Sequence, residues 1–152
     1  MFKSTFVRLR GTLFALACVL FLISCASVTL YRPSSGGRGG YSDYRIDKNT
    51  AIVSFKGDRR TSLETVKIYL LYRCAEVTLM YNYDCFCMNN IEKDQKTTYH
   101  LELQYGYWVK VPVTKNTLIA EIKMFTGDKP TDQKEAFNAK DVVEYLKSRI
   151  KR

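Results

Sequence analysis

The sequence predicts an α+β fold, in which an antiparallel sheet of about four strands carries one long helix after the first strand and a C-terminal helix. Three observations lead to this prediction. Several segments alternate apolar and polar residues with a period of two, which is typical of strands. Residues 62–81 instead repeat apolar residues at spacings of three and four, which is typical of a helix. A shorter segment near the C terminus has the same helical spacing.

The first 24 residues have the composition of a secretory signal peptide. Lys3, Arg8 and Arg10 are followed by an uncharged and mainly apolar stretch, residues 11–24. A basic start and an apolar core of roughly 7–15 residues are the marks of such a signal. We therefore expect residues 1–24 to direct the chain out of the cytoplasm and then to be removed.

Residues 22–25, of sequence LISC, resemble the lipobox of bacterial lipoproteins. The resemblance implies cleavage between Ser24 and Cys25, lipidation of the Cys25 thiol, and a membrane as partner. By the sorting rules of such lipoproteins, Ala26 implies the outer membrane, facing the periplasm, rather than the inner membrane. The alternative is an uncleaved anchor, because residues 12–30 carry no charge and about 18 apolar residues can span a bilayer.

Residues 25–43 are expected to form a tether between the lipid and a folded domain, residues 44–152. Within this segment, residues 33–40 have the sequence PSSGGRGG, and glycine at this density does not hold a regular element. As a flexible linker, about 16 residues would span roughly 20–24 Å. The interpretation is therefore a spacer that lifts the domain clear of the lipid headgroups.

The charge of the chain is positive, at a formal +9. A positive charge suits anionic lipid headgroups or other polyanions, and its spread along the sequence is equally typical of an ordinary solvated surface. Nucleic acid is not expected as a partner, because the predicted compartment lies outside the cytoplasm.

The first strand is expected over residues 44–56, because Ala51, Val53 and Phe55 alternate with the residues between them. A turn at residues 57–58 ends it.

A helix over residues 62–81 should follow, because Thr61 and Glu64 have the spacing of a capping box. One apolar stripe of this helix comprises Leu63, Val66, Leu70, Cys74, Val77 and Tyr81. A second stripe, on nearly the opposite face, comprises Ile68, Tyr72, Ala75 and Leu79. A helix that is apolar on two sides must be covered twice or it exposes an interaction surface. The C-terminal helix or the tether could supply the second cover, and a partner or a second copy is the alternative.

The remaining strands are expected over residues 83–89, 99–113 and 117–125. The second of these has the clearest period of two. Its odd positions are Tyr99, Leu101, Leu103, Tyr105, Tyr107, Val109, Val111 and Val113. We expect this face to be buried and the opposite face to be solvated. Trp108 is a large aromatic residue on the solvated face, so the candidate interaction surface comprises Ile68, Tyr72, Leu79 and Trp108.

The C-terminal helix is expected to begin at Asn138 or Asp141. Its apolar stripe comprises Ala139, Val142, Val143, Leu146 and Ile150.

Besides the lipidated Cys25, three cysteines remain after the predicted cleavage, outside the reducing cytoplasm: Cys74, Cys85 and Cys87. Counted back from a turn near residue 82, Cys74 lies about 12 Å along the helix, and Cys85 lies about 10 Å along the next strand. A Cys74–Cys85 disulfide is therefore a candidate, although pairing with Cys87 stays open. Simple packing of small residues is the alternative, because Phe86 is a better candidate to face the helix.

The sequence predicts no enzyme, no cofactor and no metal site. Cys85, Cys87 and His100 are too few for a metal site, which needs three or four converging ligands. His100 also lacks a nucleophile and an acid at the spacing of a triad. The first hypothesis is an envelope protein that binds a partner protein or stabilises an assembly. The alternative, an enzyme or small-ligand binder, predicts a pocket lined by His100, Asp84 and Glu102.

Several segments together resemble a family of small, uncharacterised lipoproteins of Gram-negative bacteria. They are GYSD at residues 40–43, TSLETV at 61–66, YLLYRCAE at 69–76 and GDKP at 127–130. The resemblance implies a lipid-anchored α+β domain without an established activity, and it supplies no catalytic residues. This sequence departs from the pattern at Cys74 and Cys85, where a small residue and an aromatic residue are expected.

Overall fold

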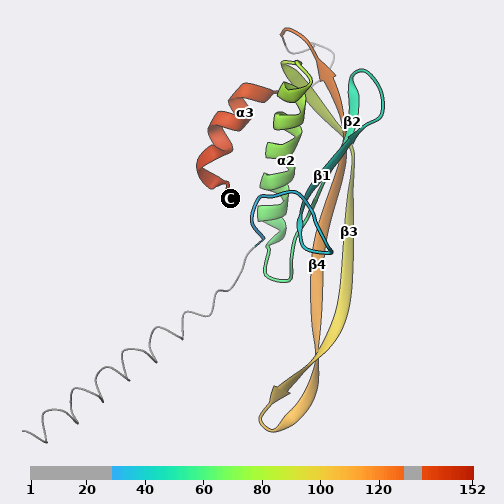
Figure 1. Ribbon diagram of the computed structural model, residues 1–152, viewed down its shortest axis with the longest axis vertical. Helices are drawn as coiled ribbons and strands as arrows, with labels where there is room; N and C mark the ends of the chain where they lie inside the picture. Colours follow the sequence, from blue (N-terminus) through green and yellow to red (C-terminus); the bar gives the residue numbers. More distant parts are fainter. Residues whose placement is uncertain (1–28, 129–134) are drawn as a thin grey trace, which may run out of the picture.

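The structure is a computed structural model, and it describes residues 29–128 and 135–152 (Figure 1). The predicted signal peptide, the cleavage site at Ser24 and the lipidation site at Cys25 lie outside these residues. In the described part of the chain, no helix has the length and apolar character needed to cross a membrane.

The fold class is α+β, as predicted, with a curled antiparallel sheet and two α-helices (Figure 1). The elements are β1 (Gly40–Arg45), β2 (Thr50–Lys56), α2 (Leu63–Met80), β3 (Cys85–Gln104), β4 (Tyr107–Phe125), β5 (Ala136–Asn138), α3 (Ala139–Leu146) and the short 3₁₀ helix η1 (Lys147–Arg149). The strands lie in the order β1-β2-β4-β3-β5, and all neighbouring pairs are antiparallel. The long helix α2 follows the first two strands, and its bounds agree closely with the predicted residues 62–81.

The core lies between the sheet and α2. The predicted apolar face of β2 is confirmed, because Ala51, Val53 and Phe55 are fully buried. The same holds for the C-terminal half of β4. Its residues Leu118, Ala120, Ile122 and Met124 are buried on the same face.

The segment before β1 is part of this core, so the prediction of a flexible tether as far as residue 43 is wrong for residues 29–43. Tyr31 is only 6 % exposed, and residues 40–45 form the edge strand β1. The glycines here permit close packing of the backbone instead of flexibility. A Cβ atom on Gly39 would lie 2.6 Å from the carbonyl oxygen of Lys56, and one on Gly40 would lie 2.4 Å from that of Arg32.

The N-terminal end of α2 differs in detail from the predicted capping box. Ser62 is the cap, and its hydroxyl accepts a hydrogen bond from the amide of Thr65 at 3.1 Å. Thr61 is buried, and its hydroxyl accepts from the amide of Thr29 at 3.0 Å. The predicted cap residue is therefore used to hold the N-terminal segment, and the neighbouring serine replaces it.

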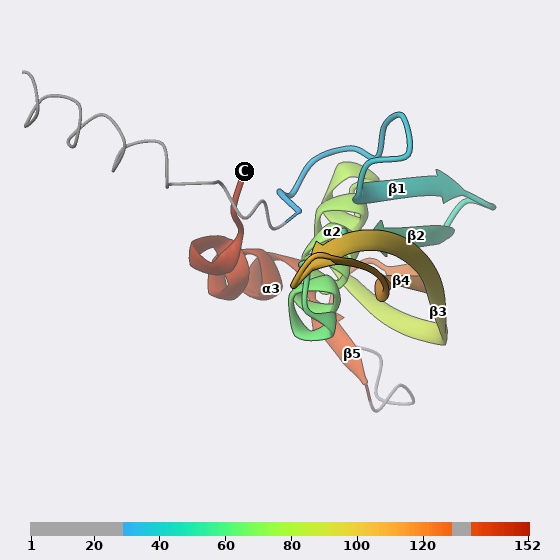
Figure 2. The same cartoon turned by 90° about the horizontal axis from the view of Figure 1, so that it is seen from below.

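The second apolar stripe of α2 is covered by other parts of the chain. The helix α3 packs along α2 on the side away from the sheet (Figure 2). Tyr72 is only 4 % exposed, and Ile68 and Leu79 are partly buried against the core. These three residues do not form one exposed surface with Trp108, as the sequence analysis had proposed. Asn138 caps α3, since its side-chain oxygen accepts from the amides of Lys140 and Asp141.

The strands β3 and β4 extend far beyond the core. The helix α2 has 18 residues, or about 27 Å at 1.5 Å per residue, whereas the 20 residues of β3 cover about 66 Å at 3.3 Å per residue. One helix therefore covers less than half of the strand. Residues 95–104 of β3 and 107–116 of β4 pair only with each other. This two-stranded segment, which we call the ribbon, projects from one end of the domain and curves beneath α2 (Figures 1 and 2).

The predicted buried face of residues 99–113 is wrong for this reason. Of the eight odd positions, Val113 alone is buried. A period of two reports the alternation of a pleated strand, but it does not report whether another layer covers either face. The predicted strand ends at residues 89, 99, 113 and 117 are also wrong, because β3 and β4 each run on through these positions. The pairing of the two strands is irregular only between Asn89 and Glu92, where the register shifts.

The turn of the ribbon lies at Tyr105 and Gly106. Both residues have a positive φ, of 52° and 84°. A two-residue loop with two positive φ values matches the twist of the strands that it joins. Gly106 therefore closes a hairpin, and is not a bend within one strand.

Candidate functional site

The cysteines do not form the predicted Cys74–Cys85 bridge. Cys74 is a free thiol, fully buried on α2, and burial raises its pKa well above the ordinary value. The Sγ of Cys85 instead points to the carbonyl oxygen of Gly127, at 3.4 Å. Phe86 takes the place in the core beside α2, so the alternation of the strand turns Cys85 to the opposite face.

The pocket expected from His100, Asp84 and Glu102 is not present. Asp84 directly precedes β3 and accepts a hydrogen bond from the amide of Gly127 at 2.8 Å. His100 and Glu102 lie on the ribbon, about 16 residues or roughly 53 Å along the strand. Their side chains are 3.7 Å apart and partly exposed. Across residues 29–128 and 135–152, no group of three or more His, Cys, Asp or Glu side chains is placed to hold a metal ion.

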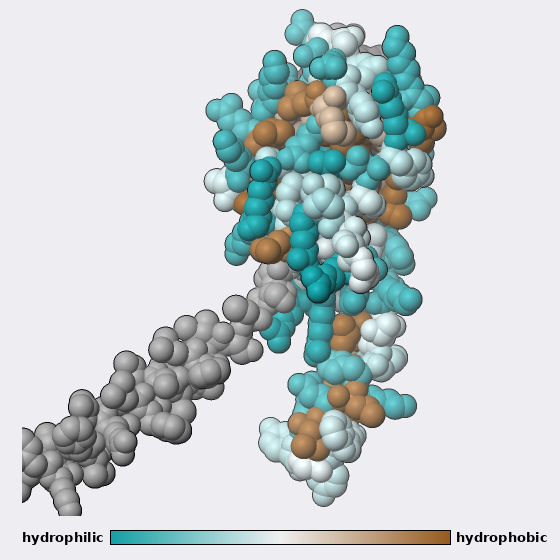
Figure 3. All heavy atoms as spheres, viewed as in Figure 1, coloured by the Kyte–Doolittle hydropathy of each residue, from teal (hydrophilic) through white to brown (hydrophobic). Residues whose placement is uncertain are grey.

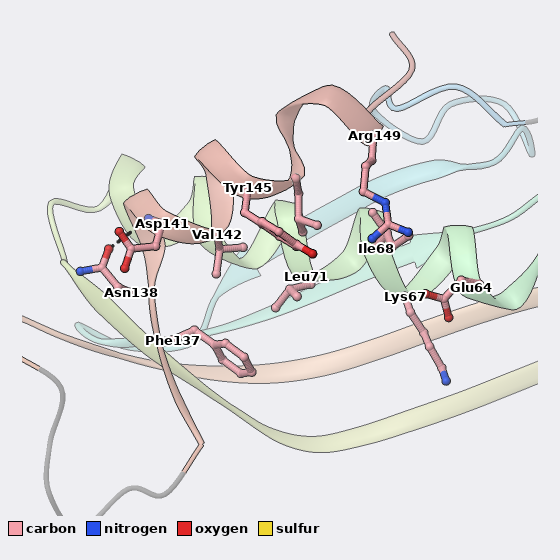
Figure 4. Close-up of a pocket in the computed structure, with 11 residues that line it drawn as sticks. Glu64, Lys67, Ile68, Leu71, Phe137, Asn138, Asp141, Val142, Tyr145 and Arg149 are labelled. Carbon is pink, nitrogen blue, oxygen red and sulfur yellow. Dashed lines mark hydrogen bonds between the residues drawn. The ribbon is translucent and has the colours of Figure 1, made fainter.

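A shallow apolar groove lies between α2 and α3 (Figure 4). Ile68 and Leu71 of α2 form one wall, and Val142 of α3 forms the other. The ring of Phe137 closes one end, and the ring of Tyr145 lies over Leu71 (Figure 4). Residues with opposite charges surround the groove, namely Glu64, Lys67, Asp141 and Arg149. Ile68, a member of the predicted interaction surface, therefore lines the junction of two packed helices.

A partly buried polar network fastens the N-terminal segment to α2. The hydroxyl of Tyr31 donates to the carboxylate of Glu76, and the guanidinium of Arg73 donates to Asp43 at 2.8 Å and to Glu76 at 2.9 Å. Arg152 adds a third contact to Glu76 at 3.1 Å. Burial raises the pKa of Tyr31, and the hydrogen bond to Glu76 raises it further. Burial alone would lower the pKa of Arg73, but its two carboxylate partners raise it.

The same network is the structural reason that the tether prediction fails. The ring of Tyr31 lies between those of Tyr41, Tyr69 and Tyr72, with centroid distances of 4.9, 5.6 and 5.2 Å. Its hydroxyl at the same time reaches a charged partner. The segment therefore has both an apolar and a polar anchor, and the chain enters the domain at a fixed point.

The ribbon is the largest departure from an ordinary soluble surface. At its turn, Tyr105 is 98 % exposed, and Trp108 is 70 % exposed. Further apolar or aromatic residues with exposed side chains are Tyr99, Leu101, Leu103, Tyr107 and Val109. Figure 3 shows brown and pale residues gathered at the free end of the ribbon. Soluble monomers seldom expose a contiguous apolar region of this kind, which typically marks a binding site.

The register of the strands defines two faces of the ribbon. Leu101 lies opposite Lys110, and Leu103 lies opposite Trp108, so these four side chains share one face with Tyr99. The other face comprises His100, Glu102, Gln104, Tyr107, Val109 and Val111. Apolar side chains thus occur on both faces, and neither face is covered by another element of the described chain.

Trp108 is exposed, as its position on the predicted solvated face implies, but most of the other exposed residues of the ribbon had been expected in the core. The alternation of Tyr99, Leu101, Leu103 and Tyr107 had predicted a core position for these side chains. The lengths of the elements could have indicated the exposed segment, because the strands are too long for the helices to cover. Comparison of the chain with protein-family models, curated proteins and solved structures finds no match.

Proposed function

We propose that this chain is a lipid-anchored protein of the bacterial outer membrane, facing the periplasm, and that its domain is a non-enzymatic binding module. The ribbon is its binding element. The observation that supports this proposal most directly is the exposure of aromatic and aliphatic side chains along the ribbon, beyond the reach of the core. The anchor rests on residues 22–25, in which Cys25 receives the lipid.

The uncovered ribbon also favours binding over catalysis. Its polar residues His100 and Glu102 stand on an open strand, without a concave site in which a small substrate would be held. An exposed strand pair with apolar side chains is instead suited to an extended surface. The groove between α2 and α3 is lined mainly by apolar side chains, and these contribute to the packing of the two helices.

Photo-crosslinking in intact cells tests the binding element. A photoreactive residue placed at Leu103, near the turn, should form adducts with the bound surface. The same residue at Tyr145, which is even more exposed but lies on α3, is the matched control and should form few. Equal labelling at both positions, or none at Leu103, would contradict the role of the ribbon.

Mass measurement of the N terminus tests the lipid anchor separately from the binding element. The Cys25→Ala variant should keep its signal peptide and show no lipid-dependent mass increase, whereas the unchanged chain should show a lipidated N terminus at Cys25. If this variant were still cleaved and still had the same mass increase, the proposed lipidation at Cys25 would be wrong.

A further inference from the structure

We propose that the end of the ribbon docks on a lipid surface, namely the headgroup region of the same membrane that holds the Cys25 lipid. This inference rests on the proposed function and identifies what the ribbon binds. Three features of the molecule support it: the place where the chain enters the domain, the length of the ribbon, and the chemistry of its end.

The chain enters the domain at the end from which the ribbon leaves it. The hydroxyl of Thr29, the first described residue, accepts a hydrogen bond from the amide of Asp58 at 2.6 Å. The neighbouring amide of Gly57 donates to the carbonyl oxygen of Asn116 at 2.8 Å, where the ribbon begins. Thr29 and the root of the ribbon are therefore joined through two adjacent residues of one loop. Figure 1 shows the ribbon continuing past this point, away from the body of the domain.

The short separation between Cys25 and Thr29 limits how the ribbon can be oriented relative to the membrane. Three residues lie between Cys25 and Thr29, so the four Cα-to-Cα steps hold Thr29 within about 14 Å of a lipid on Cys25. The ribbon extends for about ten residues, or roughly 33 Å. If the ribbon pointed away from the bilayer, the body of the domain would have to occupy the bilayer instead. The ribbon must therefore lie along the membrane surface or enter it with its free end.

The end of the ribbon has the chemistry of a membrane interface. Tyr and Trp carry an apolar ring with a polar group and concentrate at the level of lipid headgroups. Tyr105, Tyr107 and Trp108 supply three such rings at the turn, and all three are exposed. The lysines of the ribbon, Lys96, Lys110 and Lys115, outnumber its single acid, Glu102, which suits anionic headgroups.

The backbone limits how deep the ribbon can go. Both of its outer edges carry unpaired amides and carbonyls, since β3 and β4 pair only with each other there. Such groups cannot be left without hydrogen bonds in the hydrocarbon core. The ribbon therefore docks in the headgroup region, where water remains, and does not cross the bilayer.

The chain carries its own probe for this contact, because Trp108 is the sole tryptophan of the sequence. The experiment uses the full lipidated protein, diluted to less than one copy per vesicle of phosphatidylethanolamine and phosphatidylglycerol. Trp108 emission should lie at shorter wavelength than that of free N-acetyltryptophanamide in the same buffer. Lipids brominated near the headgroup should quench this emission more strongly than lipids brominated at the end of the acyl chain.

Two variants separate the possible outcomes. The double variant Leu101→Ser, Leu103→Ser should lose most of the quenching, whereas Tyr145→Ser on α3 should keep it. Trp108 that stays open to acrylamide in the aqueous phase, without quenching by brominated lipid, would overturn the inference. Protection of Trp108 that grows with the number of copies per vesicle would also overturn it, and would indicate a second copy as the occupant. If a photoreactive residue at Leu103 formed crosslinks only with protein, docking on lipid would be overturned. The proposed binding role of the ribbon would not be contradicted by that result.

Discussion

The Tyr31→Ala substitution tests whether the segment before β1 is part of the core or a free spacer. Tyr31 is 6 % exposed and lies within 6.3 Å, between ring centroids, of four aromatic rings. Truncation of a large buried aromatic side chain costs about 3–5 kcal/mol of unfolding free energy. The segment lies at one margin of the core, where the structure can partly collapse, so we expect a loss of about 3 kcal/mol.

The hydroxyl of Tyr31 can be tested apart from its ring. Tyr31→Phe removes the hydrogen bond to Glu76 but leaves that carboxylate paired with Arg73 and Arg152. Because no buried charge loses all its partners, we expect a smaller loss of about 1 kcal/mol. Urea unfolding of both variants, followed by far-ultraviolet circular dichroism, gives the two numbers from the same experiment.

Tyr44→Ala is the matched control, because Tyr44 is an exposed tyrosine on the edge strand β1. A surface substitution of this kind should change stability by no more than about 0.5 kcal/mol. If Tyr31→Ala were as mild as this control, residues 29–31 would be a free tether, and the fixed entry point of the chain would be refuted.

Three further predictions follow from other parts of the fold. Gly40→Ala should lower the unfolding free energy by at least about 2 kcal/mol in the same urea experiment, because φ at this residue is +150° and the new Cβ would meet the carbonyl oxygen of Arg32. The double variant Leu101→Ser, Leu103→Ser should leave stability within about 1 kcal/mol, since both side chains are exposed; a larger loss would place them in a core. Burial raises the pKa of Cys74 above its ordinary value of 9.0, so the unfolded chain loses this proton first. The stability linked to Cys74 is therefore intact below about pH 9 and lost as the pH rises further, and Cys74→Ala should flatten this fall in urea titrations at increasing pH.

The buried face of an element could be predicted from the sequence where the local pattern of apolar residues marks that face. The alternation of Ala51, Val53 and Phe55 predicts the buried face of β2, and the stripe through Val66, Leu70 and Cys74 predicts the buried face of α2. In both cases another element of suitable length lies against the predicted apolar face. Local pattern and tertiary packing then agree, and the prediction is correct.

The N-terminal segment could not be predicted in this way. The four glycines within residues 36–40 are equally typical of a flexible linker and of a close backbone approach, and composition alone does not distinguish these two cases. The difference arises from contacts distant in sequence, such as that between Gly39 and the carbonyl oxygen of Lys56. Tyr31, with a core position and a charged partner 45 residues away, has no local signal at all.

The prediction for the ribbon was wrong for a different reason. The alternation of its residues was recognised, but one of its faces was assumed to be covered by another element. The turn at Tyr105-Gly106 is also hard to recognise from the sequence, because tyrosine is not among the residues that usually accept a positive φ. Without a recognised turn, the odd positions on both sides of Gly106 look like one continuous buried face. Once the turn is placed, the even residue Trp108 lies opposite the odd residue Leu103 on the same face. The candidate site thus depends on the register of a hairpin that composition does not reveal.

The fixed N-terminal segment and the projecting ribbon have a joint consequence under the proposed anchoring. A lipid on a long flexible tether would hold the domain near a membrane without orienting it, because each added residue widens the range of positions. Here the hydrogen bonds of Thr29 and the burial of Tyr31 fix the chain from residue 29 on, and only three residues lie between Cys25 and Thr29. A linker this short, attached at the root of the ribbon, restricts which end of the domain can face the bilayer. The packing of residues 29–31, which contributes stability, would thereby also direct the aromatic end of the ribbon to the lipid surface.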